Sequence, residues 1–404
     1  MNCGLLGRKL SHSYSPQIHA MLGDYEYQLF ETEPNDIKDF ITGRSFDGIN
    51  VTIPYKKDVM AYCDELTDTA QKIGAVNTVV RRNGRLIGHN TDYFGFQSMV
   101  QRAGLDLAGK KVLVLGSGGA SVTAQLVLRE MNAEVVVISR SGENNYGNIA
   151  KHKDPRAIVN CTPVGMYPNN GQSPMDIRVF PELEGVLDVI YNPAKTQLIL
   201  DAEARGLITE NGLWMLVAQA KESAQWFTGK AISDDEIGKI HRTLRRQMEN
   251  IVLVGMPGCG KSTIGRRLGQ VLQREVLDAD AVLEQKFGRT IPDIFATDGE
   301  EEFRKMESWV LDDLGKLSGK IIATGGGCVT RPENYCKLRQ NATVVWVQRS
   351  LDELAVDGRP LSLKTTAEDM YQVRELLYRR FSHFAVRNDG TPEEAVQAIL
   401  SRLR

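Results

Sequence analysis

Two glycine-rich stretches of this chain have the spacing of phosphate-binding loops. In the second half, the apolar run IVLV leads to Gly255, four further residues, Gly260-Lys261-Ser262 and a segment with helical periodicity. This strand–loop–helix pattern favours a loop whose backbone N–H groups surround nucleotide phosphates. Lys261 would reach the β- and γ-phosphates, and the Ser262 hydroxyl would coordinate Mg²⁺. We therefore expect an ATP site at Gly255, Gly258, Gly260, Lys261, Ser262 and Thr263.

Charged residues and glycines after this loop indicate a small polar substrate. Asp278 and Asp280 end a short strand candidate, where one could orient the Mg²⁺ water shell and the other accept a hydroxyl proton. Arg304 begins an expected helix, and the run Gly325-Gly326-Gly327 follows an apolar strand, where three glycines allow a flat ligand to lie against the backbone. Two more candidate arginines follow, Arg359 and Arg380.

The first half has a glycine loop of a different type. VLVL, the glycines, an amphipathic segment and EVVVIS form the strand–helix–strand unit of dinucleotide-binding folds. The pattern departs from GxGxxG, because Ala120 and Ser121 stand near the third glycine position. The second strand ends in Ser139-Arg140-Ser141, without the acidic residue of NAD enzymes, and an arginine can accommodate the 2′-phosphate of NADP. We expect NADPH at Gly116, Gly118, Gly119, Ala120 and Arg140.

Residues that precede the glycine loop of the first half suit the reduction of a carbonyl group. Ser13 and Ser15 place two hydroxyls on one face of an extended segment, which suits a substrate carboxylate. Hydride addition builds negative charge on oxygen, so a lysine oriented by a carboxylate, such as Lys56 beside Asp92, would be a suitable proton donor. From residue type alone, however, Lys56 would more often be a solvated surface lysine.

Composition limits the partners and the cellular location. The chain has 404 residues, 42% hydrophobic and 25% charged, which favours two or three globular domains. A net charge of −2 gives no reason to expect nucleic acid or a membrane surface as partner. The six cysteines lack paired-ligand spacing, as in a reducing cytosol. We expect a cytoplasmic protein that acts on small molecules; its oligomeric state does not follow from the sequence.

Residues 250–403 resemble shikimate kinase. The resemblance covers the glycine loop, Asp-x-Asp at 278–280, GExxFRxxE at 299–307, the three glycines at 325–327 and the RPL segment at 359–361. It implies that Asp280 binds a substrate hydroxyl, which leaves Asp278 beside Ser262 as the candidate for Mg²⁺ and Lys261 as the candidate catalytic lysine of the phosphate loop. It further implies that Arg304 holds the substrate carboxylate, that Gly326 and Gly327 lie under the ring and that Arg359 belongs to a nucleotide-covering segment. In this family an Arg-x-Pro-Leu-Tyr segment normally supplies a second arginine for the carboxylate. The match expected here is Arg380-Phe-Ser-His-Phe384, which keeps the spacing from the arginine to the aromatic residue and makes Arg380 the second arginine.

Residues 3 to about 247 resemble shikimate dehydrogenase. The motifs are S-x-S-P, NVTxPxK, GAVNT, NTD, VIYNP and MLVAQA. The resemblance implies that Lys56 and Asp92 form the catalytic pair. The residues implied to bind the substrate are Ser13, Ser15, Thr52, Asn77, Tyr191 and Gln219. Between Arg140 and Ile158 the chain is short, so we expect a trimmed cofactor domain.

Together the two resemblances imply an α/β protein with two enzyme activities. We expect a discontinuous substrate domain at 1–93 plus 213–248, a Rossmann-like NADP domain at 94–212, and a P-loop kinase domain with a central parallel sheet at 250–404. The first half would reduce 3-dehydroshikimate to shikimate, and the second would phosphorylate shikimate to shikimate 3-phosphate. The alternatives are a dehydrogenase that also uses quinate joined to a kinase of another small polyol, or a non-catalytic sensor of pathway metabolites.

Overall fold

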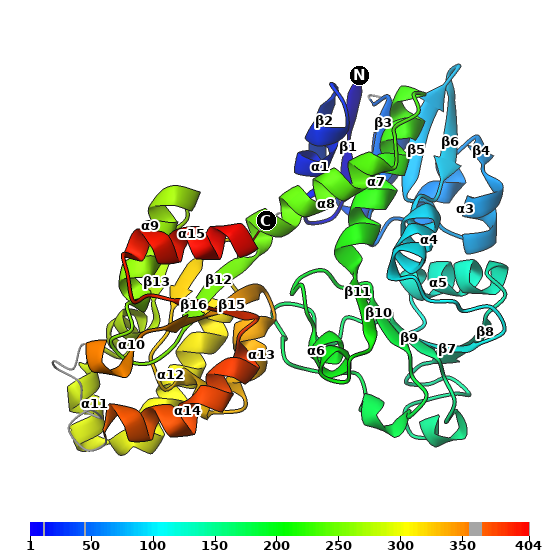
Figure 1. Cartoon of the computed structure of the whole chain (residues 1–404). Coiled ribbons are helices and arrows are strands. Elements are labelled where there is room, and N and C mark those ends of the chain that lie inside the picture. The colour runs from blue at the N-terminus through cyan, green and yellow to red at the C-terminus, as the bar shows by residue number, and fades with distance from the viewer. Residues whose placement is uncertain (11–12, 44–45, 355–365, 404) are drawn as a thin grey trace. The chain divides into compact units, whose positions relative to one another are not determined.

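The structure is a computed structural model that describes residues 1–10, 13–43, 46–354 and 366–403. The chain divides into two compact units. The first contains residues 1–166, 172–191 and 198–244, and the second contains residues 167–171, 192–197 and 245–404. Each unit has helices packed on β-sheets (Figure 1), which confirms the expected α/β architecture.

A mixed sheet forms the N-terminal part of the first unit. Its strands are β1 (Asn2–Gly7), β2 (Glu26–Glu31), β3 (Gly48–Val51), β4 (Glu65–Leu66), β5 (Thr78–Arg82) and β6 (Arg85–His89), in the spatial order β2-β1-β3-β5-β6-β4. β5 is antiparallel to β3 and β6, whereas the other pairs are parallel. The accompanying helices are α1 (Ser15–Leu22), α2 (Ile37–Gly43), α3 (Asp68–Ile73) and α4 (Asp92–Ala103).

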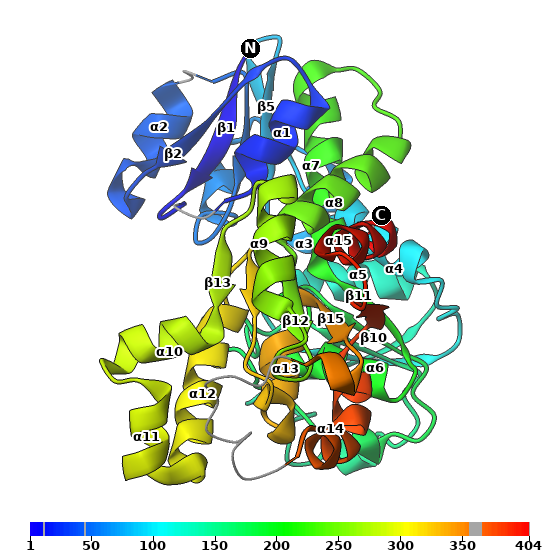
Figure 2. The same ribbon diagram turned by 60° about the vertical axis from the view of Figure 1, so that its left-hand side comes forward.

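The two faces of this sheet pack against different helices. Ile41 of α2 belongs to the same apolar cluster as Val79, whereas Val80 packs with Phe227 of α7 (Gly212–Thr228). Successive side chains of a strand point to opposite faces, which explains why Val79 and Val80 belong to different clusters. Figure 2 shows α2 on one side of β1 and α1 with α7 on the other. The sheet is therefore covered on both faces.

A parallel sheet forms the second part of the first unit. Its strands are β7 (Lys111–Leu115), β8 (Glu134–Ile138), β9 (Ala157–Asn160), β10 (Gly185–Asp188) and β11 (Ile208–Asn211), in the order β11-β10-β9-β7-β8. Its helices are α5 (Gly119–Glu130) and α6 (Gln197–Ala204). Residues 139–156, which join β8 to β9, contain only a short 3-10 helix at Ile149–Lys151. β8 is consequently an edge strand, in keeping with the short connection seen in the sequence.

Helix α7 carries the chain from the parallel sheet back to the mixed sheet. Asn211 caps its start by accepting the N–H of Leu213 at 3.0 Å. α7 packs against α4 and also contacts β3 and β5. α8 (Asp235–Met248) follows, with an apolar stripe of buried side chains at Ile237, Ile240, Leu244 and Met248.

The second unit is built on one parallel sheet of five strands. The strands are β12 (Asn250–Val254), β13 (Val276–Asp278), β14 (Ile321–Ala323), β15 (Ala342–Gln348) and β16 (Phe384–Arg387), in the order β13-β14-β12-β15-β16. The helices are α9 (Lys261–Leu272), α10 (Ala279–Phe287), α11 (Ile291–Thr297), α12 (Gly299–Gly315), α13 (Asn334–Arg339), α14 (Ala367–Phe381) and α15 (Pro392–Arg402). β12 lies at the centre of this sheet, and all its residues are buried. A central apolar strand before the glycine loop is what the sequence predicts. Among the described helices, none is both long and apolar enough to cross a membrane.

Candidate active sites

The loop between β12 and α9 is folded as a phosphate-binding cradle. Gly255, Gly258 and Gly260 have φ angles of 148°, 85° and 98°, which residues with a Cβ rarely adopt. Lys261 begins α9, and its Nζ donates hydrogen bonds of 2.9 Å to the carbonyls of Gly255 and Met256. The ammonium is thereby fixed next to the N-terminus of α9, where anions are favoured.

Ser262 and Asp278 bring two oxygen ligands for a divalent cation together. The Ser262 hydroxyl donates a 2.7 Å hydrogen bond to Asp278 Oδ2. Asp278 Oδ1 accepts the backbone N–H of Asp280 at 3.1 Å and so caps α10. Within the described residues, no group of three or more His, Cys, Asp or Glu side chains could hold a metal ion. The pair fits Mg²⁺, which binds proteins through few oxygen ligands and takes the rest from water and phosphate.

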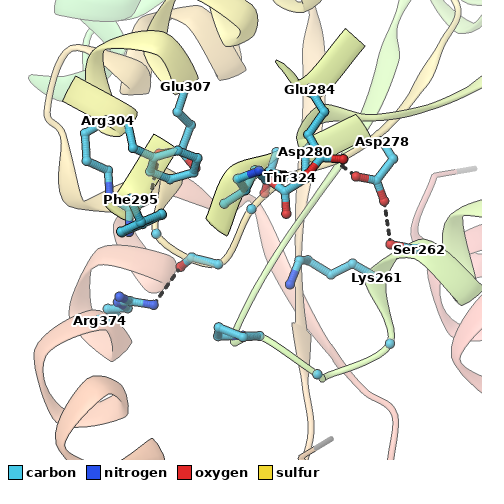
Figure 3. Close-up of a pocket in the computed structure, with 18 of the residues that line it drawn as sticks. Lys261, Ser262, Asp278, Asp280, Glu284, Phe295, Arg304, Glu307, Thr324 and Arg374 are labelled. Carbon is cyan, nitrogen blue, oxygen red and sulfur yellow. Dashed lines mark hydrogen bonds and ion pairs between the residues drawn. The ribbon is translucent and has the colours of Figure 1, made fainter. Parts of the chain in front are cut away.

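A cavity of about 690 Å³ opens beside the glycine loop. Figure 3 shows Lys261, Asp280, Arg304, Glu307 and Arg374 at its border. Apolar side chains contribute another part of the lining, at Ile291, Pro292, Phe295 and Phe303. The combination suits a small molecule with an apolar ring, hydroxyls and a carboxylate.

Asp280 is a largely buried carboxyl group in the lining of this cavity. Burial, together with the nearby carboxylates of Glu307 and Asp278, raises the pKa of Asp280 to about 6. A carboxyl with a raised pKa is a stronger base than an exposed aspartate. Both acids of the Asp-x-Asp motif line the cavity, but they differ in their contacts, because the Asp278 carboxylate accepts the Ser262 hydroxyl.

The three consecutive glycines fit against side chains of the site. A Cβ on Gly325 would lie 2.7 Å from Glu307 Oε1 and 2.8 Å from Asp280 Oδ1, and one on Gly327 would overlap the guanidinium of Arg304. Arg304, in turn, donates from Nη1 to Glu307 Oε2 at 2.8 Å, and both side chains are buried. Glycine is thus required here to let the charged residues approach the backbone. Sequence reasoning missed Glu307, although it is the last residue of the FRxxE motif.

Arg374 lines the cavity together with Arg304, whereas Arg380 does not. Arg374 is buried, lines the cavity and donates from Nη1 to the Gly326 carbonyl at 3.3 Å. Arg380 lies on the exposed side of α14, with its guanidinium 5.7 Å from the ring centre of Tyr335. The expected role of Arg380 is therefore corrected: six residues along a helix amount to more than one and a half turns, which turns the side chain away. Arg359 lies outside the described residues.

A sequence signal for Arg374 existed. Arg374-Glu-Leu-Leu-Tyr378 keeps the spacing of Arg-x-Pro-Leu-Tyr, with leucine in place of proline. Tyr378 confirms this register, because its hydroxyl donates to the Gly326 carbonyl at 2.5 Å, next to the bond from Arg374. The missing proline concealed the match.

Lys56 and Asp92 form a direct ion pair in the first unit. Lys56 Nζ lies 2.6 Å from Asp92 Oδ2, and the two side chains are 29% and 17% exposed. Asp92 is the first residue of α4, and its backbone N–H donates to Asn90 Oδ1 at 3.1 Å. A lysine this well paired and this little exposed is not the solvated surface residue that its type suggests.

Asn77 and Gln219 lie next to this ion pair through Thr91. Asn77 Oδ1 accepts the backbone N–H of Thr91, the residue before Asp92, at 2.7 Å. Gln219 Oε1 accepts the Thr91 hydroxyl at 3.4 Å. Three predicted site residues from distant parts of the sequence thereby come together: Asn77 just before β5, Asp92 in α4 and Gln219 in α7.

The serines at the start of α1 form a second group with Tyr191. Ser13 Oγ accepts the backbone N–H of Ser15 at 3.2 Å. Tyr14, between the two serines, meets the Tyr191 ring edge-on with 6.2 Å between ring centres. The backbone N–H of Thr52 donates to the Leu6 carbonyl at 2.9 Å and continues the pairing of β3 with β1.

The loop between β7 and α5 leaves an open space for a dinucleotide. Gly116 has a φ of 102°, and a Cβ on Gly118 or Gly119 would meet no atom within 4 Å. The Ser121 hydroxyl donates to the Gly116 carbonyl at 2.6 Å and fixes the loop. Ala120 follows in the first turn of α5, and Arg140 is exposed just after β8. An open glycine loop at a helix N-terminus fits a pyrophosphate, so the residues present suit NADP(H).

Both halves match known protein families. Residues 257–404 match the model for shikimate kinase, and residues 5–79 match the model for the shikimate dehydrogenase substrate binding domain. Shikimate dehydrogenase (NADP(+)) from Clostridium perfringens strain SM101 is 34% identical over 264 residues, which cover 60% of this chain and 97% of that protein. The enzyme of the same name from Symbiobacterium thermophilum is 38% identical, over 56% of this chain and 88% of its own length.

Solved structures agree with these matches. Shikimate dehydrogenase 1 from Peptoclostridium difficile aligns with a TM-score of 0.55 and 37% identity over 61% of this chain and 98% of its own. A chorismate mutase/shikimate 5-dehydrogenase fusion protein from Clostridium acetobutylicum aligns with a TM-score of 0.58 and 35% identity, covering 60% of this chain and 96% of its own.

The folds and sites define a dinucleotide-dependent oxidoreductase that continues into a P-loop kinase. The chain belongs to the shikimate dehydrogenase family, and a shikimate kinase domain follows. It is a bifunctional shikimate-pathway enzyme that uses NADP(H) for the first activity and ATP with Mg²⁺ for the second. The sequence-based expectations of family, activities and cofactors are confirmed.

Proposed function

We propose that this chain catalyses two consecutive reactions: it reduces 3-dehydroshikimate to shikimate and then phosphorylates shikimate to shikimate 3-phosphate. The first reaction is assigned to a substrate domain at 1–93 plus 213–248 and an NADP domain at 94–212, and the second to a kinase domain at 250–404. The separate sheets at residues 2–89, 111–211 and 250–387 support this division.

Lys56 is proposed as the proton donor of the reduction, and its ion pair with Asp92 is the observation that carries this assignment. NADPH, when bound, supplies the hydride. The carbonyl oxygen gains negative charge as it is reduced, and the Lys56 ammonium is a proton source for that oxygen. Asp92, 2.6 Å away, orients the ammonium through this hydrogen bond.

The carboxylate and hydroxyls of the substrate are proposed to bind to the two clusters of polar residues. Ser13, Ser15 and Tyr191 offer hydroxyls for the carboxylate, because the Ser13 hydroxyl bonds to the N–H of Ser15 and Tyr14, between the serines, packs on Tyr191. Asn77, Gln219 and Thr52 then bind the ring hydroxyls near the catalytic pair.

The cofactor is proposed to lie along the β7–α5 loop. Gly116, Gly118, Gly119 and Ala120 would accept the pyrophosphate, since open glycines permit close approach of the backbone. Arg140 would hold the 2′-phosphate from the end of β8. Both positions correspond to carboxyl ends of parallel strands, where such folds bind dinucleotides.

In the kinase site, Asp280 is proposed as the base for the attacking hydroxyl. The supporting observation is the cavity in which Asp280, Arg304 and Arg374 meet beside Lys261. The two buried guanidiniums would hold the carboxylate of shikimate, because bidentate arginine pairing is the strong mode of carboxylate recognition. Gly326 and Gly327 leave room for the ring.

The nucleotide is proposed to bind along the β12–α9 loop. MgATP, when bound, supplies the phosphoryl group. Gly255, Gly258, Gly260 and Thr263 would surround the phosphates, and Lys261 would neutralise charge that grows during transfer. Ser262 and Asp278 would hold Mg²⁺, Asp278 directly or through water.

One coupled assay tests the proposal. The full chain is mixed with 3-dehydroshikimate, NADPH and MgATP, while NADPH oxidation and ADP release are followed together. We expect ADP release to depend on prior NADPH oxidation when only 3-dehydroshikimate is given, and to occur without NADPH when shikimate is given. Quinate and other small polyols serve as competing substrates in parallel samples. Faster turnover of any of these would contradict the substrate assignment.

A further inference from the structure

Beneath the proposed dehydrogenase site lies a buried polar network centred on Asn50. Asn50 stands on β3, and its side chain is almost entirely covered. Its Oδ1 accepts the hydroxyl of Tyr27 at 2.8 Å, and its Nδ2 donates to Ser223 Oγ at 2.7 Å and Thr78 Oγ1 at 3.1 Å. One amide thus connects β2, β3, β5 and α7.

The network continues from Asn50 to Thr91. Thr91 Oγ1 lies 3.0 Å from Ser223 Oγ and 3.4 Å from Thr78 Oγ1. Thr78, Thr91 and Ser223 are all fully buried. No water is needed to satisfy them, because the hydroxyls bond to one another.

Residues proposed to touch the substrate bond to this network at separate points. Asn77 accepts the Thr78 hydroxyl at 3.0 Å, and Gln219 accepts the Ser223 hydroxyl at its backbone carbonyl at 2.9 Å. The side chain of Ser15 is near enough to Tyr27 to offset part of the rise that burial causes in the pKa of Tyr27. The network therefore reaches both clusters of substrate residues.

Tyr27 is itself held in a fixed orientation. The ring of His19 stacks on it with 3.9 Å between ring centres, and His19 Nδ1 bonds to the Tyr25 hydroxyl at 2.6 Å. Since Tyr27 cannot turn freely, its bond to Asn50 ties the start of α1 to the middle of the sheet. A buried polar side chain with every partner in place specifies one arrangement of the elements that it joins.

We propose that Asn50 is a positioning residue of the dehydrogenase reaction, which sets the distance between the Ser15 and Asn77–Gln219 clusters that hold the two ends of the substrate. This inference rests on the proposed roles of Ser15, Asn77 and Gln219. Asn50 acts through its neighbours and need not touch the substrate. Removing its amide leaves the hydroxyls of Tyr27, Ser223 and Thr78 without their common partner.

The test compares Asn50→Ala with Val79→Ala in the full chain. Val79 is a fully buried residue of β5, next to Thr78, in an apolar cluster. Both variants lose buried contacts of the same sheet, but only Asn50→Ala breaks the network. We expect Asn50→Ala to raise KM for 3-dehydroshikimate about tenfold and to lower kcat, with KM for NADPH unchanged. Val79→Ala should lower Tm without changing either KM.

Ligand-induced shifts of Tm provide a readout besides activity. In Asn50→Ala, shikimate should no longer raise Tm, whereas NADP⁺ should raise it as in the parent enzyme. Ser223→Ala serves if Asn50→Ala does not fold, because Asn50 keeps its bonds to Thr78 and Tyr27. It should shift KM in the same direction by about threefold.

Gln219→Ala separates failure of this inference from failure of the site assignment. A rise in KM for Gln219→Ala together with a parental KM for both Asn50→Ala and Ser223→Ala would overturn the positioning role alone. A parental KM for Gln219→Ala would overturn the substrate assignment on which the inference rests. Equal rises of KM for 3-dehydroshikimate in Asn50→Ala and Val79→Ala would also overturn the positioning role of Asn50, because a merely structural role predicts that result.

Discussion

The two glycine loops of this enzyme are built alike and differ in charge. Each follows an inner strand of a parallel sheet and opens a helix, and the first glycine of each, Gly116 or Gly255, has a positive φ. In each loop, the carbonyl of that glycine accepts a hydrogen bond from the helix that follows. The donor is the neutral hydroxyl of Ser121 in the first loop and the ammonium of Lys261 in the second.

The difference reflects where each reaction develops charge. Phosphoryl transfer develops its charge at the phosphates held by the loop, so a cation inside the loop serves catalysis. In the reduction, the charge grows on the substrate carbonyl, and the corresponding cation is Lys56 in the other domain. The dinucleotide loop therefore needs no cation of its own and only has to fit the shape of the cofactor.

Lys261→Ala should abolish phosphorylation and leave the reduction intact. Loss of a cation that stabilises the transferring phosphoryl group costs on the order of a thousandfold in kcat. ADP release and NADPH oxidation are measured on the same preparation, so the second activity reports on folding. Comparable losses in both activities would mean that Lys261 is structural, through its bonds to Gly255 and Met256.

Lys56→Ala should give the reverse pattern. We expect NADPH oxidation with 3-dehydroshikimate to fall by about a hundredfold, which is the usual size of general acid catalysis. Phosphorylation of added shikimate should stay at the parental rate. Lys57→Ala, at the next residue, is the matched control and should leave both rates unchanged. If Lys56→Ala still reduces 3-dehydroshikimate at the parental rate, then Lys56 is not the catalytic cation of the reductase.

The glycine loops could be predicted from the sequence because their spacing is local, whereas the pairing of Lys56 with Asp92 was implied only by the resemblance to shikimate dehydrogenase. Gly255 to Ser262 is a continuous motif, and the run of glycines before α5 follows an unmistakable apolar strand. Packing at long range could not be predicted in this way. Asn50 meets Ser223 across 173 residues of sequence, and no spacing rule connects them.

The structure places Arg374 at the cavity where the sequence-based prediction had placed Arg380, which shows a second limit of prediction from sequence. The sequence contains several arginines on α14, and only the helix phase decides which of them faces the cavity. Arg374 shares its buried side with Tyr378, four residues later, whereas Arg380 is exposed. Periodicity of the buried residues would have favoured Arg374, had it been weighed above the position of the aromatic residue.

Arg374→Ala and Arg380→Ala therefore form a matched pair. Arg374→Ala should raise KM for shikimate by about tenfold or more, because a hydrogen bond to a charged group is worth roughly 1.5–3 kcal/mol. Arg380→Ala, on the same helix but outside the cavity, should leave KM within twofold. Initial rates of ADP release at varied shikimate concentrations measure both. The opposite ranking would restore Arg380 to the site.

Arg140→Ala should reduce the preference of the reductase for NADPH over NADH. An exposed arginine on a phosphate contributes about 1–2 kcal/mol, so the ratio of the two kcat/KM values should fall by about tenfold. Arg129→Ala, on the exposed last turn of α5, is the control. If the parent enzyme already uses both cofactors equally, then the first site has no charge for the 2′-phosphate and its loop is neutral throughout.

Ser121→Ala should have the smallest effect, because it removes a neutral hydrogen bond from a loop whose role is shape. The lost bond to the Gly116 carbonyl is worth about 0.5–1.5 kcal/mol, so KM for NADPH should rise only a few fold. Gln125, whose amide also donates to Ser121 Oγ, is partly exposed and can turn to solvent.

Thr123→Val is the matched control, since its equally buried hydroxyl bonds only within α5, to Gly119 at 3.4 Å. It should leave KM for NADPH unchanged. A loss of a hundredfold or more in reductase activity in Ser121→Ala, with Thr123→Val unaffected, would show that this hydroxyl matters as much to its loop as Lys261 does to the kinase loop. The contrast between a neutral and a charged loop would then be wrong.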